Sequence, residues 1–112
     1  MKRTAVVILL SFLISCSKKP NSQLIIGSWS MHIAKVNATI NLNFTDKHTL
    51  IVNFREDDKD DRDTMNYKLI NNEKGLITTE KNGDVEEFDI AKLTINNLVL
   101  IKGNDTLDLK KD

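Results

Sequence analysis

Apolar and polar residues alternate along most of this chain, and this period of two constrains the fold more than any other feature. Trp29, Met31 and Ile33 alternate with Ser30 and His32. Such alternation places the apolar side chains on one face of a strand. Groups this short are typical of strands. Further groups begin at Ile40, Leu50, Met65, Leu76, Phe88, Leu98 and Leu107.

Residues that favour tight turns separate these groups. Asn82-Gly83 tolerates positive φ and predicts a two-residue type I′ hairpin turn. Weaker turn signals lie at Asp46-Lys47, 71–75, Asn96-Asn97 and 103–105. Short links pair neighbouring strands in order, so we expect an all-β fold: a small antiparallel up-and-down meander of about eight strands that closes into a barrel and so loses its edges. The strands are expected near 28–36, 39–45, 49–55, 64–71, 75–80, 84–91, 92–102 with a turn at its middle, and 105–110.

The first residues predict a secretory signal. Lys2 and Arg3 form a positive start, and residues 5–14 are apolar except for Ser11. This run of about ten residues is half the length that a membrane-spanning helix needs. We therefore expect a signal peptide at residues 1–15, a modified cysteine and linker at 16–23, and a folded domain at 24–112.

The stretch Leu13-Ile14-Ser15-Cys16 resembles the bacterial lipobox. The resemblance implies that the signal is cut before Cys16 and that this cysteine carries acyl chains, which would anchor the protein in a membrane. An ordinary signal peptide that contains a cysteine is the alternative. Ser17 stands where an aspartate would imply retention in the inner membrane, so the resemblance implies the outer membrane. Which face of that membrane the domain occupies stays open.

Composition narrows the class of protein. Removal of the first 15 of 112 residues leaves 97, which suits one domain. Lys2 and Arg3 leave with the signal, so 14 basic residues face 16 acidic ones, and this balance gives no electrostatic case for binding nucleic acid. Cys16 is the one cysteine of the chain, so no intrachain disulfide forms and stability must come from a core.

The first predicted strand begins at Gly27-Ser28-Trp29. The chain ends with a segment at 93–100 and a final strand at 107–110. This pattern resembles lipocalins, fatty-acid-binding proteins and small lipocalin-like lipoproteins of Gram-negative bacteria. The resemblance implies a barrel that Trp29 plugs at one end, with Gly27 allowing the chain to turn sharply into the strand. The chain departs from the family in its shorter length and in lacking a Thr-Asp-Tyr motif. It also lacks the arginine that covers the tryptophan, with only Lys110 and Lys111 nearby.

The inward positions of this barrel are almost wholly apolar. Glu86, in phase with Phe88, and Thr79, in phase with Ile77, are the expected polar exceptions. An eight-stranded interior is either filled by its own side chains or holds one small ligand. If it holds a ligand, we expect an apolar guest at the end away from the tryptophan. The expected ligand-binding residues are Phe54, Tyr67 and Phe88.

Other candidate sites have plainer explanations. Residues 55–63 are mostly acidic but lack the spacing of a calcium loop, so they predict a solvated hairpin tip. His32 faces outward and His48 lies at a turn, so no metal site is expected. Glu86 and Glu87 are adjacent on a strand and point to opposite faces, which is wrong for a paired acid and base. We expect no enzyme, no catalytic residue and no cofactor.

Two functions remain open. The first is a lipid-anchored envelope protein that binds a small hydrophobic ligand in a lipocalin-like barrel. The second is a protein-interaction module, such as a subunit of an envelope complex or an inhibitor, whose barrel core is filled. The fold by itself does not choose between them, and the sequence names no protein partner.

Overall fold

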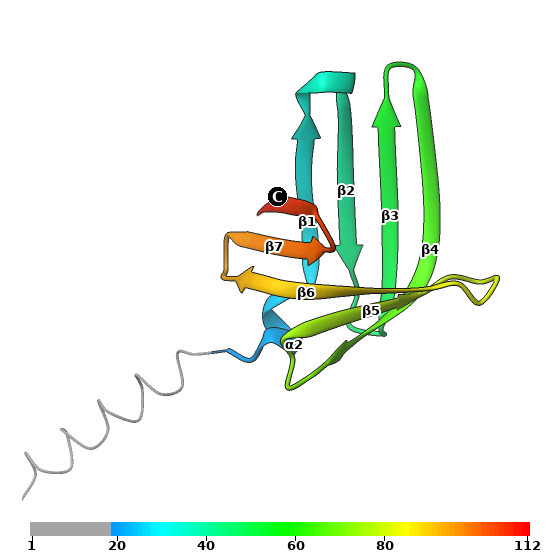
Figure 1. Ribbon diagram of the computed structural model, residues 1–112. Coiled ribbons are helices and arrows are strands. Elements are labelled where there is room, and N and C mark those ends of the chain that lie inside the picture. The colour runs from blue at the N-terminus through cyan, green and yellow to red at the C-terminus, as the bar shows by residue number, and fades with distance from the viewer. Residues whose placement is uncertain (1–18) are drawn as a thin grey trace, which may run out of the picture.

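The computed structural model describes residues 19–112, and these residues form a closed barrel of eight antiparallel strands (Figure 1). Each strand pairs with the next along the chain, and the last pairs back with the first. The expected all-β up-and-down meander is therefore confirmed. The strands are β1 (Gly27–Ile33), β2 (Ala38–Phe44), β3 (Thr49–Glu56), β4 (Lys59–Ile70), β5 (Gly75–Thr79), β6 (Val85–Leu93), β7 (Asn97–Lys102) and β8 (Asp105–Lys111).

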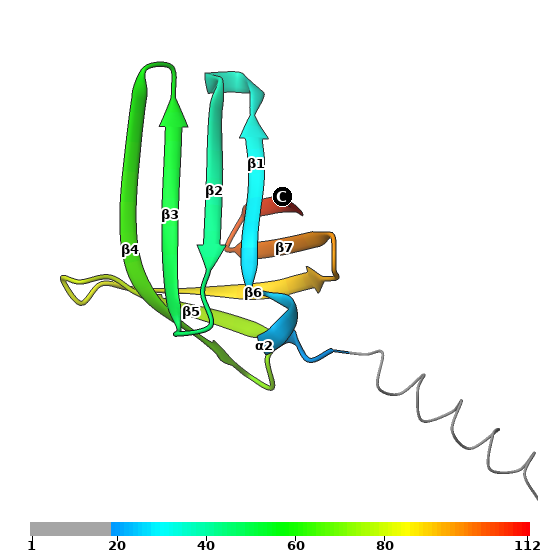
Figure 2. The same ribbon diagram turned by 180° about the vertical axis from the view of Figure 1, so that it is seen from behind.

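Two short helical segments accompany the strands. Helix α2 (Asn21–Leu24) precedes β1, and the 3-10 turn η1 (Ala34–Val36) joins β1 to β2. Helix α2 lies beside the turn between β4 and β5 (Figure 2). Asn21 Nδ2 donates to the Glu73 carbonyl at 2.7 Å, and the Ser22 N–H donates to Glu73 Oε1 at 3.1 Å. Ordered contacts with the barrel therefore begin three residues before the expected domain start at Leu24.

The alternation seen in the sequence builds the core. Antiparallel pairing sets Trp29 opposite Leu42, and Leu42 opposite Val52, so inward side chains of neighbouring strands meet. Burial of this apolar surface is the main stabilising term in a domain without a disulfide. The buried apolar residues of the described chain are Ile25, Trp29, Ala38, Leu42, Phe44, Leu50, Tyr67, Leu76, Leu98, Leu100 and Leu109.

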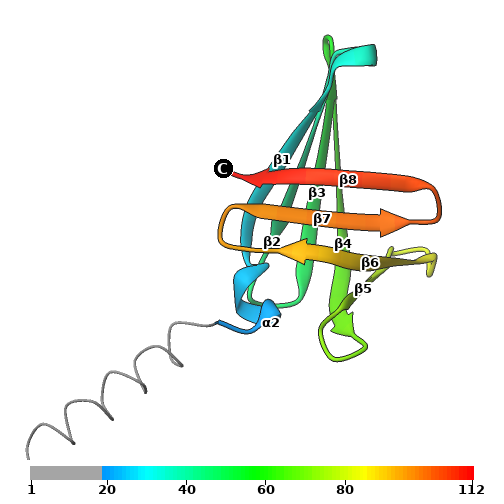
Figure 3. The ribbon, with the colours of Figure 1, turned by 60° about the vertical axis from the view of Figure 1, so that its left-hand side comes forward.

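Strands β1 to β4 extend beyond the part of the barrel in which they pair with β8 and β5. β8 pairs with β1 at Trp29↔Lys111 and Ser30↔Lys110, and the pairing of β4 with β5 starts at Asn66↔Thr79. The parts of β1 to β4 beyond these pairs, residues 31–40 and 53–64, are called the extension below. Figures 1 and 3 show it rising past β6, β7 and β8, which run across the lower half.

The acidic segment 55–63 lies in the extension. β4 starts at Lys59, earlier than the expected residue 64, and Glu56 pairs with Lys59 next to the turn. Arg55 also forms an exposed ion pair with Asp60 at 3.5 Å. Most of this segment is therefore paired strand, and the solvated tip itself is short. Sequence reasoning placed the strand late because charged residues are uncommon in strands.

The predicted type I′ turn at Asn82-Gly83 is wrong. Gly83 has φ +96°, but Asn82 is not among the residues with positive φ, which type I′ requires at both positions. The link spans five residues, and the Gly83 N–H donates to the Glu80 carbonyl at 2.9 Å. Asn82 instead accepts a hydrogen bond at Oδ1 from the Asp84 N–H at 2.9 Å, and this local bond favours the longer turn.

Residues 1–18 are not described by the structure, so the predicted signal and Cys16 lie outside the described residues. Among residues 19–112, no helix has the length and apolar character that would let it cross a membrane.

Candidate functional site

The barrel interior contains a cavity of about 250 Å³. Its wall is apolar and comes from both halves of the barrel, including Leu42, Val52, Met65, Leu76 and Phe88. The interior is therefore not completely filled by its own side chains. A cavity of about 150 Å³ lined by apolar groups holds benzene, so this one has room for a somewhat larger apolar guest.

One end of the interior is closed around Trp29, which is fully buried, as is Ile25 below it. The Trp29 indole donates from Nε1 to the Ile25 carbonyl at 2.8 Å, so the segment after α2 is held against the ring. Lys111 Nζ lies 4.5 Å from the ring centroid and donates to the Ile26 carbonyl at 2.8 Å. Lys111 thus places a cation over the face of the buried tryptophan.

Gly27 makes room for this lysine. Its φ is +128°, a conformation that glycine adopts readily and other residues avoid. A Cβ at this position would lie 2.5 Å from Lys111 Nζ and 2.9 Å from its Cε. The glycine is therefore needed both for the backbone turn into β1 and for the close approach of Lys111 from the last strand.

The structure places the three expected ligand-binding residues in three different environments. Phe88 lines the cavity. Phe54 faces the inner side but lies in the extension, half-buried and opposite Ile40 and Asp61, and it is not part of the cavity wall. The sequence correctly predicted that Phe54 faces inward. However, β3 continues beyond the barrel, and the alternation of apolar and polar residues does not show where along a strand the barrel ends.

Tyr67 belongs to the closed end and not to the cavity wall. Its ring meets Phe44 edge-on with centroids 5.0 Å apart, and its hydroxyl donates to the Thr45 carbonyl at 2.7 Å. Burial, with a smaller contribution from Asp46, raises the pKa of the Tyr67 phenol above its ordinary value. The Tyr67 hydroxyl therefore fixes the link between β2 and β3, and its ring does not line the cavity.

The open end of the cavity is acidic. Glu80 and Glu86 lie on its lining, together with Thr78, which is 4% exposed and pairs with Glu86 across β5 and β6. Partial burial raises the pKa of Glu80, and the nearby carboxylates of Asp63, Asp84 and Glu86 raise it further. Lys102 pairs with Glu86 at 3.3 Å. The cavity thus combines an apolar interior with a negatively charged mouth.

Sequence reasoning found Glu86 but missed Glu80 and Thr78. It placed Ile77 and Thr79 inward, whereas the structure buries Leu76 and Thr78 and pairs Ile77 with Glu87 on the outer face. The turn before β5 contains three consecutive left-handed residues, 71–73, and sets the register Leu69↔Leu76. Two adjacent apolar residues give no phase, so only this register decides which one points inward.

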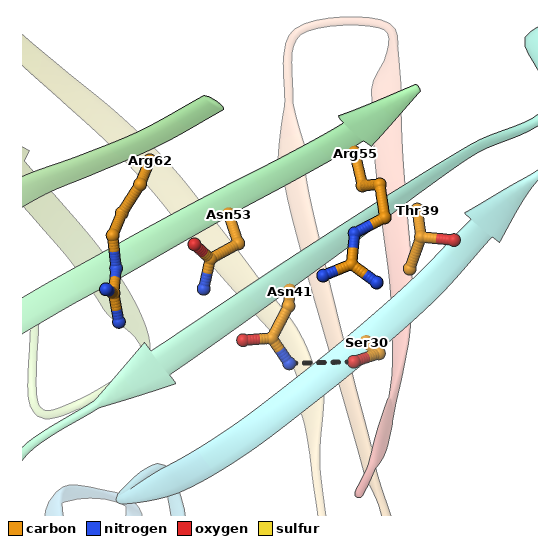
Figure 4. A pocket seen from close by; sticks show the side chains of 6 residues that line it. All are labelled: Ser30, Thr39, Asn41, Asn53, Arg55 and Arg62. Carbon is orange, nitrogen blue, oxygen red and sulfur yellow. Dashed lines mark hydrogen bonds between the residues drawn. The ribbon is translucent and has the colours of Figure 1, made fainter. Parts of the chain in front are cut away.

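A second hollow, of about 520 Å³, lies on the outer face of β1 to β4 (Figure 4). Polar residues line it, with Asn41 Nδ2 donating to Ser30 Oγ at 2.8 Å. Asp112 Oδ2 accepts hydrogen bonds from Ser28, Ser30 and Asn41, and these bonds, led by that of Ser28, lower the pKa of Asp112. Many polar groups at one end of this hollow are therefore satisfied within the chain. The lining residues are Ser30, Thr39, Asn41, Asn53, Arg55 and Arg62.

The two histidines lie at opposite ends of the sheet. His32 Nδ1 is 3.2 Å from Thr39 Oγ1 on the outer face of the extension, whereas the ring of His48 packs 6.1 Å from that of Tyr67 near the closed end. Within residues 19–112, no group of three His, Cys, Asp or Glu residues is placed to hold a metal ion.

Comparisons with known proteins give a fold and no family. No family model matches the chain, and no curated protein matches it. The chain is similar to a solved structure, described as an NMR structure of a protein from Bacteroides uniformis ATCC 8492, with a TM-score of 0.69 and 18% sequence identity. The alignment covers 80% of this chain and 90% of that one. The chain thus shares the fold of a protein from Bacteroides uniformis.

Proposed function

We propose that this protein is a lipid-anchored binding protein of the cell envelope whose barrel takes up a small hydrophobic ligand. The cavity of about 250 Å³ with its apolar wall is the observation that supports binding of such a ligand. The lipobox-like stretch that ends at Cys16 supports the anchor, and Ser17 in place of an aspartate supports the outer membrane as its location. In this proposal the protein acts by holding a ligand, with neither catalysis nor a cofactor.

The cavity size limits the ligand. By proportion to the 150 Å³ cavity that holds benzene, it has room for about ten non-hydrogen atoms. A chain of eight carbons fits this limit, and at about 0.8 kcal/mol per buried CH₂ it gains about 6 kcal/mol before the costs of binding. The expected dissociation constant for such a chain is therefore at or below about a millimolar.

The test is binding of 1-octanol, which is uncharged, to the full chain in phosphatidylcholine nanodiscs, with empty nanodiscs as the blank. Val52 lines the cavity, and Val52→Phe should fill part of it and weaken binding at least tenfold. Ile51 is adjacent on β3 and faces outward, so Ile51→Phe is the matched control and should bind octanol as the unmodified protein does. Equal binding by all three proteins, or by none, would contradict a ligand in the barrel.

A protein-interaction module is the second candidate, and the extension favours it. Beyond the cavity, its inner face carries Ile33 and Phe54, both half-buried, and the exposed Val36 lies at its end. Neither Ile33 nor Phe54 packs against the buried core cluster. Apolar residues outside a core are typical of contact surfaces. A stable complex captured by the protein and lost on Phe54→Ser, with octanol binding unchanged or absent, would favour this function.

A further inference from the structure

We infer that the ligand of the barrel is a cationic amphiphile, with its apolar chain in the cavity and its ammonium or similar positive group at the mouth between Glu80 and Glu86. This inference rests on the proposed function, because it concerns the chemistry of the ligand in the same cavity.

Two carboxylates lie on the wall of the cavity. Glu80 and Glu86 belong to the lining of the cavity itself, together with apolar side chains such as Leu107 and Phe88. Glu86 on β6 pairs with Thr78 on the neighbouring strand β5, and Phe88 pairs with Leu76. Glu86 therefore stands one inward position beyond the apolar pair of Phe88 and Leu76. A ligand long enough to fill the cavity therefore places its head beside these two groups.

Several carboxylates gather around Glu80. The charges of Asp63 on β4, Asp84 in the β5–β6 link and Glu86 on β6 all act on it and raise its pKa. Lys102 neutralises the charge of Glu86 alone, through an exposed ion pair in which Nζ lies 3.3 Å from Oε2. Within residues 19–112, Asp63, Glu80 and Asp84 form no ion pair. The mouth therefore carries an excess of negative charge.

The gathered negative charge affects which ligand head is favoured. Partial burial raises the pKa of Glu80, and repulsion by the neighbouring carboxylates raises it further. A positive group placed among them would relieve the repulsion, whereas a carboxylate would add to it. The mouth thus selects against fatty acids as well as in favour of amines, and such rejection is how binding sites gain specificity.

Thr78 adds a polar contact beside Glu86, with which it pairs across β5 and β6. Its side chain is 4% exposed and lines the cavity. Its hydroxyl oxygen can accept a hydrogen bond from a donor on the ligand head. An ammonium group has three donors and fits both the hydroxyl and a neighbouring carboxylate.

The test compares three ligands with the same eight-carbon chain and different heads: octylamine, 1-octanol and octanoate. Each is titrated at pH 7 and low ionic strength against the full chain in phosphatidylcholine nanodiscs, with empty nanodiscs as the blank. We expect octylamine to bind at least tenfold more tightly than octanol, and octanoate at least tenfold more weakly. Addition of 0.5 M salt should reduce the preference for the amine, because salt screens exposed charges.

Two variants locate the effect. Glu80→Gln should lower the affinity for octylamine about tenfold and leave the affinity for octanol unchanged. Glu87→Gln is the matched control, because Glu87 is exposed, lies on β6 next to Glu86 and pairs with Ile77 on the outer face. It should change neither affinity. Octanol binding also reports whether the cavity of each variant is intact, so a folding defect is not mistaken for a lost charge contact.

The outcomes separate this inference from the proposed function. If octanol binds but octylamine binds no more tightly, or if Glu80→Gln leaves the preference intact, the inference is wrong and a hydrophobic ligand remains supported. If none of the three ligands binds, the proposed function itself is wrong, and the inference is wrong with it.

Discussion

Lys111 covers Trp29, with its Nζ 4.5 Å from the ring centroid, and the two residues also pair across the seam between β8 and β1. The contact joins the last strand of the barrel to the first, so it lies where the meander must close on itself. The ammonium also donates to the Ile26 carbonyl at 2.8 Å and holds the segment that caps the buried indole. One lysine thus takes part in closing the sheet and in closing one end of the barrel.

We expect Lys111→Met to destabilise the protein by about 1–2 kcal/mol, because it removes the cation and the hydrogen bond but keeps an unbranched apolar stem. Lys111→Arg should recover most of this loss. Lys110→Met is the control: Lys110 is exposed and faces outward, so its change should be within about 0.5 kcal/mol. Urea unfolding followed by Trp29 fluorescence measures all three, and an equal loss for Lys110→Met would contradict the role given to Lys111.

Gly27→Ala should cost about 2 kcal/mol or more, because alanine is strained at φ +128° and its Cβ would approach Lys111 Nζ to 2.5 Å. Gly83→Ala is the comparison. That glycine has φ +96° with no atom within 4 Å of the new Cβ, so strain acts there without a clash. In a double-mutant cycle, Gly27→Ala should cost less in a Lys111→Ala background, since the clash is gone. Strictly additive effects would show that the two residues do not interact.

Trp29→Ala should destabilise the barrel by about 3–5 kcal/mol, as truncation of a buried aromatic side chain does. Trp29 is fully buried and its Nε1 donates to the Ile25 carbonyl, so the unmodified protein should also fluoresce at short wavelength. Emission at the wavelength of an exposed indole in the folded protein would contradict this placement.

Asp112 should make the stability depend on pH. Its pKa is lowered below 3.8 by hydrogen bonds from Ser28, Ser30 and Asn41, partly offset by burial. A carboxyl group with a lowered pKa stabilises the fold at pH values above 3.8, and this contribution is lost as the pH falls through the lower value of the folded state.

Asp112→Asn should therefore cost about 0.5 kcal/mol at pH 7, a modest amount because the group is largely exposed and screened. The difference from the unmodified protein should shrink towards zero near about pH 2. Glu80, with its raised pKa, has the opposite pH dependence but is present in both proteins, so it cancels in the comparison. Thermal unfolding at both pH values measures the effect, and a difference that does not change with pH would exclude Asp112 as its source.

Cys16→Ser should abolish labelling of the protein with radioactive fatty acid and leave an uncleaved or mislocalised precursor, because the acyl chains are proposed to be attached to that thiol. Labelling in growing cells followed by membrane fractionation measures both effects. Ser15→Ala serves as the control, since a small residue before the cysteine is kept. Normal labelling of Cys16→Ser would rule out this anchor.

The fold class, the number of strands and their order could be predicted from the sequence alone, because alternation and turn residues act between neighbours in the chain. The groups around Trp29, Leu42 and Val52 were assigned to the correct face for this reason, and their pairing followed from the short links between them. Glu86 was likewise placed on the inner face through its phase with Phe88.

Where the barrel ends and what lies at its mouth depend on strand registers that became visible in the folded structure. Phe54, Tyr67 and Phe88 share the inward phase, yet of these three only Phe88 lines the cavity. Tyr67 lies at the closed end, whereas Phe54 lies in the extension, because the pairing of Trp29 with Lys111 sets how much of β1 to β4 the barrel encloses. That pair joins residues at opposite ends of the domain, and local pattern carries no information about such a register. The approach of Glu80 to Asp63 and Glu86 depends on the registers of β5 with β4 and with β6, which the alternation of apolar and polar residues around Leu76 and Ile77 did not reveal.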